Sequence, residues 1–121
     1  MPRPPNSTPV LISCPDCDGV LSVRQVSNSN RSEYQCQTGH RYSTMSLLDG
    51  KEAQFEHVLW HVVALTEHLD TICEDAERQA KEDGDTGVLA ELARRRRQVR
   101  AHSDRTRAML AETEPAKQTS A

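Results

Sequence analysis

The hydrophobic positions of this chain follow two different periods, and the change falls near residue 43. Residues 11–42 contain two short runs rich in apolar and β-favouring residues, GVLSVRQV and SEYQC, separated by the polar segment SNSN. Runs of this kind around turn-forming residues predict a small β-hairpin. Beyond residue 43 the apolar residues recur at helical spacing, so we expect the strands to give way to a helix.

The first predicted helix carries an apolar residue at every third or fourth position. Ser43 is expected to cap its N-terminus, and Gly50 is expected to weaken it, by about 1 kcal/mol relative to alanine, or to break it. Leu59, Trp60 and Val63 form a second apolar face, which we expect to be core. The main heptad seam consists of Phe55, Val58, Val62, Leu65, Leu69, Ile72 and Ala76.

A second helix is predicted over about residues 87–111, after a turn in the segment KEDGDTG. Its weaker apolar stripe consists of Leu89, Leu92, Val99, Met109 and Leu110. A connection this short makes the two helices antiparallel. Because a two-helix hairpin rarely buries its apolar surface alone, we also expect a homodimer through the helices.

The composition shows how little core this chain can build. It has 121 residues, of which 36% are hydrophobic and four are aromatic. A chain so poor in core material depends on a metal, on disulfides or on a partner. It has no apolar run long enough to span a membrane, and residues 1–10 lack the apolar region of a signal peptide. These features predict a cytoplasmic protein, in which clustered cysteines bind metal more often than they form disulfides.

Three cysteines and a histidine have the spacing of a metal site. The pattern is Cys14-x2-Cys17, eighteen intervening residues, and Cys36-x3-His40. Each pair belongs to one tight turn, and the predicted hairpin brings the two turns together. Three thiolates and an imidazole are ligands that zinc prefers, and four protein ligands leave no open coordination position. We therefore predict one structural Zn²⁺ and no catalytic residue.

Other interpretations of these residues remain open at this point. Cys14 and Cys17 could form a redox pair, although the following DGVLSV has the pattern of a strand where a thioredoxin-like motif needs a helix. Iron could replace zinc. Cys73 could replace His40 as the fourth ligand, although its place in the helical seam favours a small buried apolar residue.

The motifs CPDCDGVL, YQCQTGHRYSTMSLL and FEHVLWHVVALTEHL resemble a known bacterial module. It is the small zinc-binding C-terminal extension of some chemotaxis-type protein-glutamate methylesterases, with the pattern C-P-x-C-G-G-x-L followed by C-x-x-G-H-x-Y-S. The resemblance covers about residues 11–80. The chain departs from it at Asp18, where the family has glycine, and by one residue between Cys36 and Gly39 when the shorter spacing is counted strictly. It implies a role in bacterial signalling without the esterase domain, for which this chain has no room.

Together these patterns predict a small α+β protein in which a zinc ribbon precedes an antiparallel helical hairpin. The predicted parts are a disordered leader at 1–10, the zinc ribbon at 11–42, the helical hairpin at 43–112 and a disordered tail at 113–121.

Charge is distributed unevenly over the hairpin. Residues 49–85 carry eleven acidic and three basic residues, whereas residues 86–110 carry seven arginines and two acidic residues. The arginines are expected mainly to pair with the acidic helix. Some of them could instead contact a partner protein or nucleic acid. These candidates are Arg94, Arg95, Arg96, Arg97 and Arg100.

The histidines of the first helix are a weaker candidate site. His57 and His61 are four residues apart, a spacing that can bind a metal, and His68 lies on the same side. Without a third ligand placed beside them, a solvated helix face is the favoured interpretation.

The function predicted from these features is a non-enzymatic zinc-binding protein that acts as an adaptor or regulatory module for a protein partner. The alternative is a nucleic-acid-binding regulator that uses the arginine-rich helix. No pairing of a nucleophile with a base is visible in the sequence, so we expect no enzyme activity.

Overall fold

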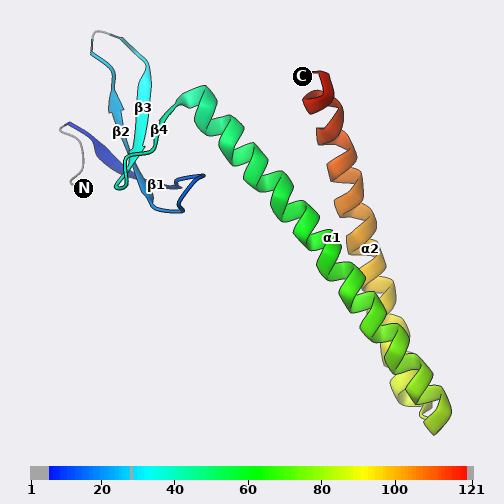
Figure 1. Cartoon of the computed structure of the whole chain (residues 1–121). Helices are drawn as coiled ribbons and strands as arrows, with labels where there is room; N and C mark the ends of the chain where they lie inside the picture. The colour runs from blue at the N-terminus through cyan, green and yellow to red at the C-terminus, as the bar shows by residue number, and fades with distance from the viewer. Residues whose placement is uncertain (1–5, 28, 120–121) are drawn as a thin grey trace. The chain divides into compact units, whose positions relative to one another are not determined.

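The computed structural model describes residues 6–27 and 29–119, and the chain forms two compact units, Met1–Phe55 and Glu56–Ala121. The first unit contains an antiparallel sheet and the start of a long helix, and the second contains two paired helices (Figure 1). The predicted small α+β fold is confirmed. Within the described ranges, no helix has the length and apolar character needed to cross a membrane.

The sheet of the first unit has four strands in the order β1-β2-β3-β4, each antiparallel to its neighbour. The strands are β1 (Thr8–Ser13), β2 (Val20–Gln25), β3 (Ser32–Cys36) and β4 (Arg41–Ser43). The predicted hairpin is the β2–β3 pair, in which Val23 lies opposite Tyr34. The sequence patterns did not indicate β1 and β4. Strand β1 begins inside the predicted leader, whose first five residues lie outside the described part of the chain.

The core of the sheet unit is very small. Its buried members are Cys14, Leu21, Cys36 and Leu47, with Val10, Tyr34 and Tyr42 packed against them. Two of the four buried side chains are cysteines, so apolar packing alone contributes little to the stability of this unit.

Helix α1 (Thr44–Asp83) begins with a reciprocal cap. The Ser43 hydroxyl accepts a hydrogen bond from the Ser46 amide at 3.1 Å, and the Ser46 hydroxyl accepts one from the Ser43 amide at 2.9 Å. This arrangement satisfies amides that the first helical turn leaves without partners. It confirms Ser43 as the N-cap.

The helix continues through Gly50 without the expected break. A side-chain β-carbon at this position would lie 2.9 Å from Pro15 Cγ, so only glycine lets the helix approach the first cysteine turn so closely. The neighbouring side chains hold this contact. Lys51 donates a hydrogen bond to Ser13 Oγ at 2.7 Å, and Gln54 donates one to the carbonyl of Pro15 at 3.2 Å.

In the helical unit, α1 lies beside α2 (Thr86–Thr119), and the two helices run in opposite directions (Figure 1). Gly84, with φ 68°, ends the first helix, and the Asp85 carboxylate caps the second by accepting a hydrogen bond from the Val88 amide at 3.1 Å. Helix α2 is longer than predicted and includes residues 113–119, which we expected to be a disordered tail. Residues 120–121 lie outside the described ranges.

The helices pack through a different face of α1 from the predicted heptad seam. Leu59 and Val63 are buried against Leu110 of α2. Further buried positions on the two helices are Thr66, Cys73, Ala80 and Thr106. Trp60 was expected in the core but is 45% exposed, because successive helical residues differ by about 100° in direction and Leu59 already faces α2.

The seam itself remains largely uncovered. The side chains of Val58, Leu65, Leu69 and Ile72 are 46–61% exposed, and Phe55 is 52% exposed. The periodicity therefore predicted a helix correctly, but it did not identify which of two adjacent apolar faces packs inside this chain.

Candidate metal centre

The first pair of candidate ligands lies in the turn between β1 and β2. Cys14 directly follows β1, and its amide donates a hydrogen bond to the Gly19 carbonyl at 2.7 Å. The Asp18 amide donates one to the Cys14 carbonyl at 2.9 Å, which folds the chain back on itself. A β-carbon at Gly19 would lie only 3.3 Å from Cys17 Sγ, so glycine leaves room for this sulfur.

The second pair lies in the turn between β3 and β4. Cys36 is the last residue of β3, and its amide donates a hydrogen bond to the His40 carbonyl at 3.1 Å. Gly39 has φ 104°, a left-handed conformation that side chains disfavour. This conformation of Gly39 turns the chain so that His40 lies beside Cys36.

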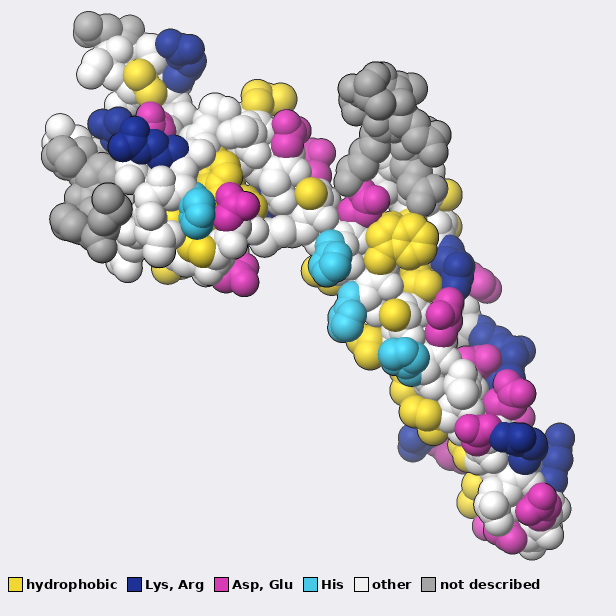
Figure 2. All heavy atoms as spheres, viewed as in Figure 1, with side chains coloured by type: hydrophobic (Ala, Val, Ile, Leu, Met, Phe, Trp, Pro, Cys, Tyr) yellow, Lys and Arg dark blue, Asp and Glu magenta, His cyan; other side chains and the backbone are white. Residues whose placement is uncertain are grey.

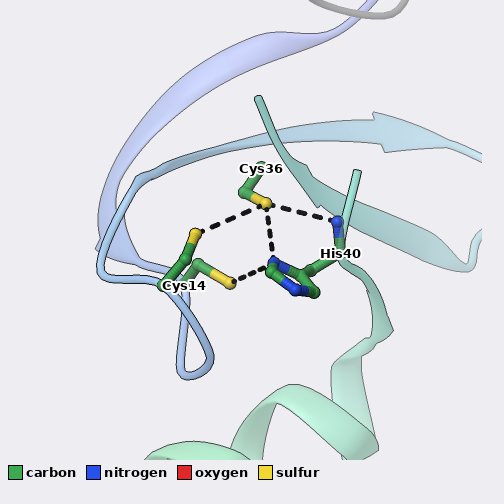
Figure 3. A group of neighbouring side chains, drawn as sticks. Cys14, Cys36 and His40 are labelled. Carbon is green, nitrogen blue, oxygen red and sulfur yellow. Dashed lines mark hydrogen bonds between the residues drawn. The ribbon is translucent and has the colours of Figure 1, made fainter. Parts of the chain in front are cut away.

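The four candidate ligand atoms lie within 4.8 Å of one another. Cys17 Sγ is 3.7 Å from Cys36 Sγ, and Cys14 Sγ is 3.6 Å from His40 Nδ1. Figure 3 shows that Cys36 and Cys14 both face this nitrogen, which is 3.2 Å from Cys36 Sγ. A tetrahedral zinc with usual bond lengths needs about 3.8 Å between two sulfurs and about 3.5 Å between sulfur and nitrogen. The cluster therefore fits zinc, with Nδ1 as the ligating nitrogen.

Hydrogen bonds around the site lower the pKa of two of the thiols. Burial alone would raise the pKa of Cys36, but a hydrogen bond with the Thr38 side chain and one from the His40 amide outweigh it and lower the pKa to about 5. At Cys14 burial is again outweighed, here by hydrogen bonds with the Tyr42 side chain and the local backbone, and the pKa falls. Both shifts favour the thiolate, the form of cysteine that binds a metal.

The other two ligands respond to this negative charge. The hydrogen bond to the Cys36 sulfur raises the pKa of His40. Hydrogen bonds from Thr38 and Gly19 lower the pKa of Cys17, but burial and the neighbouring thiols Cys14 and Cys36 outweigh them, so that the pKa rises. A divalent cation would offset the repulsion between the clustered thiolates, because its positive charge neutralises theirs.

Two supporting residues were missed at the sequence level. The Thr38 hydroxyl lies 3.0 Å from Cys36 Sγ and donates to Cys17 Sγ at 3.5 Å. The Tyr42 hydroxyl lies 3.2 Å from Cys14 Sγ and donates a hydrogen bond to the Asp16 carboxylate. Tyr42 follows His40 by two residues, and residues two apart along a strand share a face. The two-residue spacing from His40 was the feature of the sequence that could have identified Tyr42.

The structure removes one of the alternative ligand sets. Cys73 is buried in the helical unit, 7% exposed, and is not a member of the cluster. It therefore does not replace His40, and its predicted role as a small buried residue is confirmed. The choice between zinc and iron remains a prediction from the ligand types.

The α1 histidines do not form a second centre within residues 6–27 and 29–119. His57, His61 and His68 are all exposed, and no further group of potential ligands gathers around them. This agrees with a solvated helix face.

The arginine-rich segment is divided between several contacts. Arg96 bridges the two helices, with its guanidinium 2.8 Å from Asp70, 3.0 Å from Glu77 and 3.5 Å from Glu74. Arg100 lies 3.2 Å from Asp70. The expected pairing with the acidic helix is therefore present.

The remaining arginines of the run are not paired with the acidic residues of α1. Arg94 and Arg95 both pair with Glu91 of their own helix, at 2.7 and 2.9 Å. Arg97 is exposed and makes no ion pair with any residue in the described part of the chain. The five candidates thus do not form one uniform basic surface.

A metal held by these four side chains would have no open coordination position, which is typical of a structural site. Comparisons with protein families, with curated proteins and with solved structures found no match for this chain. Its function must therefore be inferred from the centre itself and from the surface of the helical unit.

Proposed function

We propose that this chain is a non-enzymatic zinc protein that acts as an adaptor for another protein. The observation that carries the proposal is the convergence of Cys14, Cys17, Cys36 and His40 within 4.8 Å. A metal there would stabilise the small sheet unit, because structural zinc supplies roughly 10–16 kcal/mol to domains of this size. The metal itself would then have no open position for chemistry.

The adaptor role is supported by the surface of the helices. Large apolar side chains remain exposed at several successive turns of α1, and contiguous exposed apolar surface is typical of protein interaction sites. The resemblance to the extension of chemotaxis-type methylesterases leads us to propose a place in bacterial signalling. In its favour, Asp18 adopts φ 62°, a left-handed conformation for which the glycine of that family is well suited.

Nucleic-acid binding through α2 is the less favoured function. Four of the five candidate arginines, all except Arg97, are already paired with carboxylates, which leaves few cations for phosphate contacts.

Metal analysis and cobalt substitution test the zinc centre. We expect one equivalent of zinc in the purified protein, and a cobalt-loaded form with the intense visible absorption of a tetrahedral thiolate site. Cys36→Ser should reduce zinc affinity at least tenfold, whereas the matched control Cys73→Ser should keep it unchanged. Equal loss in both variants, or a protein that binds no divalent metal, would reject the centre.

Site-specific photo-crosslinking in the native host tests the adaptor role. A photoreactive residue at Leu69, on the exposed apolar face, should yield products larger than two copies of this chain. The control position is Thr71, which is exposed on a different side of α1. If both positions give the same products, the apolar face is not where a partner protein binds.

A further inference from the structure

An apolar row along α1, which begins at the last residue of the first unit and continues into the helical unit, is left exposed. This row, which we call the α1 stripe, consists of Phe55, Val58, Val62, Leu65, Leu69 and Ile72. Val62 is half-buried, and the other five side chains are 46–61% exposed. Figure 2 shows hydrophobic side chains along the same edge of the helices as the histidines.

We infer that the α1 stripe binds a second copy of this chain, with the two α1 helices antiparallel. The first argument is the spacing of the stripe, which reads 3, 4, 3, 4, 3 in either direction along the helix. Such a row is complementary to itself about a two-fold axis, as an isologous dimer contact requires. The axis pairs Phe55 with Ile72, Val58 with Leu69, and Val62 with Leu65 of the second copy.

The second argument is the groove beside one half of the stripe. A groove of about 440 Å³ lies there, with Leu69, Ile72 and Cys73 of α1 and Leu92 and Val99 of α2 as its apolar lining. Arg94, Arg95 and Gln98 of α2 also line it. In the antiparallel register the groove receives Phe55 and Val58 of the second copy. A parallel register would place the two grooves against each other and leave a void, which close packing disfavours.

The third argument is charge. From Glu52 to Glu77, α1 contains no lysine or arginine. Its acidic residues Glu67 and Asp70 are paired with arginines of α2, on the side away from the stripe. The other flank of the stripe carries the exposed side chains of His57, His61 and His68.

The groove beside the stripe carries Arg94 and Arg95, and both are paired with Glu91 of their own helix. A second copy brings no like charge against them, because its α1 has no lysine or arginine from Glu52 to Glu77. The inference goes beyond the proposed function, because it gives the apolar face to a second copy, with which any other protein must compete at Leu69. It rests on the proposed function only for the identity of the surface. The resulting assembly has four helices, α1 and α2 from each copy, an arrangement common for amphipathic helices of this length.

Sedimentation equilibrium of the zinc-loaded full chain tests the dimer. We expect a mass twice that of one chain, with a dissociation constant in roughly the micromolar range. Leu65→Glu places a carboxylate at the centre of the contact and should weaken association at least a hundredfold. Thr71→Glu adds the same charge outside the stripe and should leave the dimer unchanged. A wild-type monomer at about 100 µM, or a Leu65→Glu variant that dimerises normally, would overturn the inference.

Disulfide trapping tests the register without a disruptive charge. In a Cys73→Ser background, the double variant Val58→Cys/Leu69→Cys should oxidise to a covalent dimer. Each single variant should stay uncrosslinked, because equivalent residues of the two copies then lie about 16 Å apart along the helix axis. Crosslinking of the single variants would show a parallel pair and refute the antiparallel register.

The two proposals fail in different ways. A monomeric chain that still yields products with another protein from Leu69 would refute the dimer and leave the adaptor role standing. A dimer with no other product would support the inference and count against an adaptor that uses this face.

Discussion

At the scale of single residues, the most informative position is Gly50. From the sequence, Gly50 is expected to destabilise the helix, since glycine lowers helix stability by about 1 kcal/mol relative to alanine. In the structure, Gly50 also lies in close contact with Pro15, in the turn that carries Cys14 and Cys17. Local propensity and tertiary contact therefore favour opposite residues at this position.

We predict that Gly50→Ala weakens the metal centre. The new β-carbon would lie 2.9 Å from Pro15 Cγ and 3.1 Å from its Cβ, so the cysteine turn must move. Overpacking of this kind costs about 1–3 kcal/mol, against a gain of about 1 kcal/mol in helix propensity. Competition with a chromogenic chelator should show zinc affinity reduced by up to about thirtyfold.

Gly87→Ala is the matched control in the other helix. The nearest atom to its new β-carbon is Asp85 Oδ1 at 3.7 Å, an ordinary contact distance. This variant should leave zinc affinity unchanged. If the two alanine variants behave alike, close packing against Pro15 is not the reason for glycine at position 50.

At the scale of secondary-structure elements, the helical hairpin combines a thin apolar contact with a polar network. Leu59, Val63 and Leu110 form a small buried cluster. Farther along the pair, Arg96 is 19% exposed and lies among three carboxylates of α1. The opposite charges of the two helices predicted such pairing, but only the structure identifies Arg96 as the central residue.

We predict that Asp70→Asn destabilises the hairpin by about 1 kcal/mol at neutral pH, within the range of partly exposed ion pairs. The hydrogen bond from Arg96 holds the pKa of Asp70 below its usual value. The carboxylate therefore contributes stability above the pKa of the unfolded chain and loses it as the pH falls through its folded pKa. Urea unfolding should show a difference at pH 7 that disappears in strong acid.

The control for this prediction is Asp75→Asn. Asp75 pairs only with Arg78 of its own helix, and its side chain is 61% exposed. Its removal should change the stability of the hairpin by a few tenths of a kcal/mol at most. An equal loss in both variants would indicate a general effect of charge on α1 instead of the bridge to α2.

At the scale of the whole molecule, two compact units differ in what stabilises them. The sheet unit has a core of four buried residues, two of which are candidate ligands. The helical unit is held by its own apolar contact and ion pairs, and none of the metal ligands belongs to it. We therefore expect the metal to control the first unit and to have little effect on the second.

We predict that a chelator unfolds the sheet unit while most of the helix signal survives. The helices contain 40 and 34 residues, and only residues 44–55 of α1 belong to the first unit. Those 12 of 74 residues limit the loss of far-UV circular dichroism to about one sixth. Hydrogen exchange should become fast in β2 and β3 and stay slow near Val63.

His40→Ala should reproduce the effect of the chelator, and His61→Ala is its control on the exposed helix face. Complete loss of helix signal on metal removal would contradict the independence of the two units. It would show that the chain unfolds as one cooperative structure.

The sequence by itself determined the candidate ligand set, the hairpin between Cys17 and Cys36, the start of α1 at its serine cap and the antiparallel direction of the helices. These features depend on local spacing, turn chemistry and periodicity, all of which can be read from neighbouring residues. Only the tertiary structure decided that Gly50 lies against Pro15, that Arg96 bridges the helices and that Leu59 and Val63 pack inside while Leu65 stays exposed. Each of these depends on the rotation of one element against another, and adjacent apolar faces of a helix differ by too small a rotation for periodicity to choose between them.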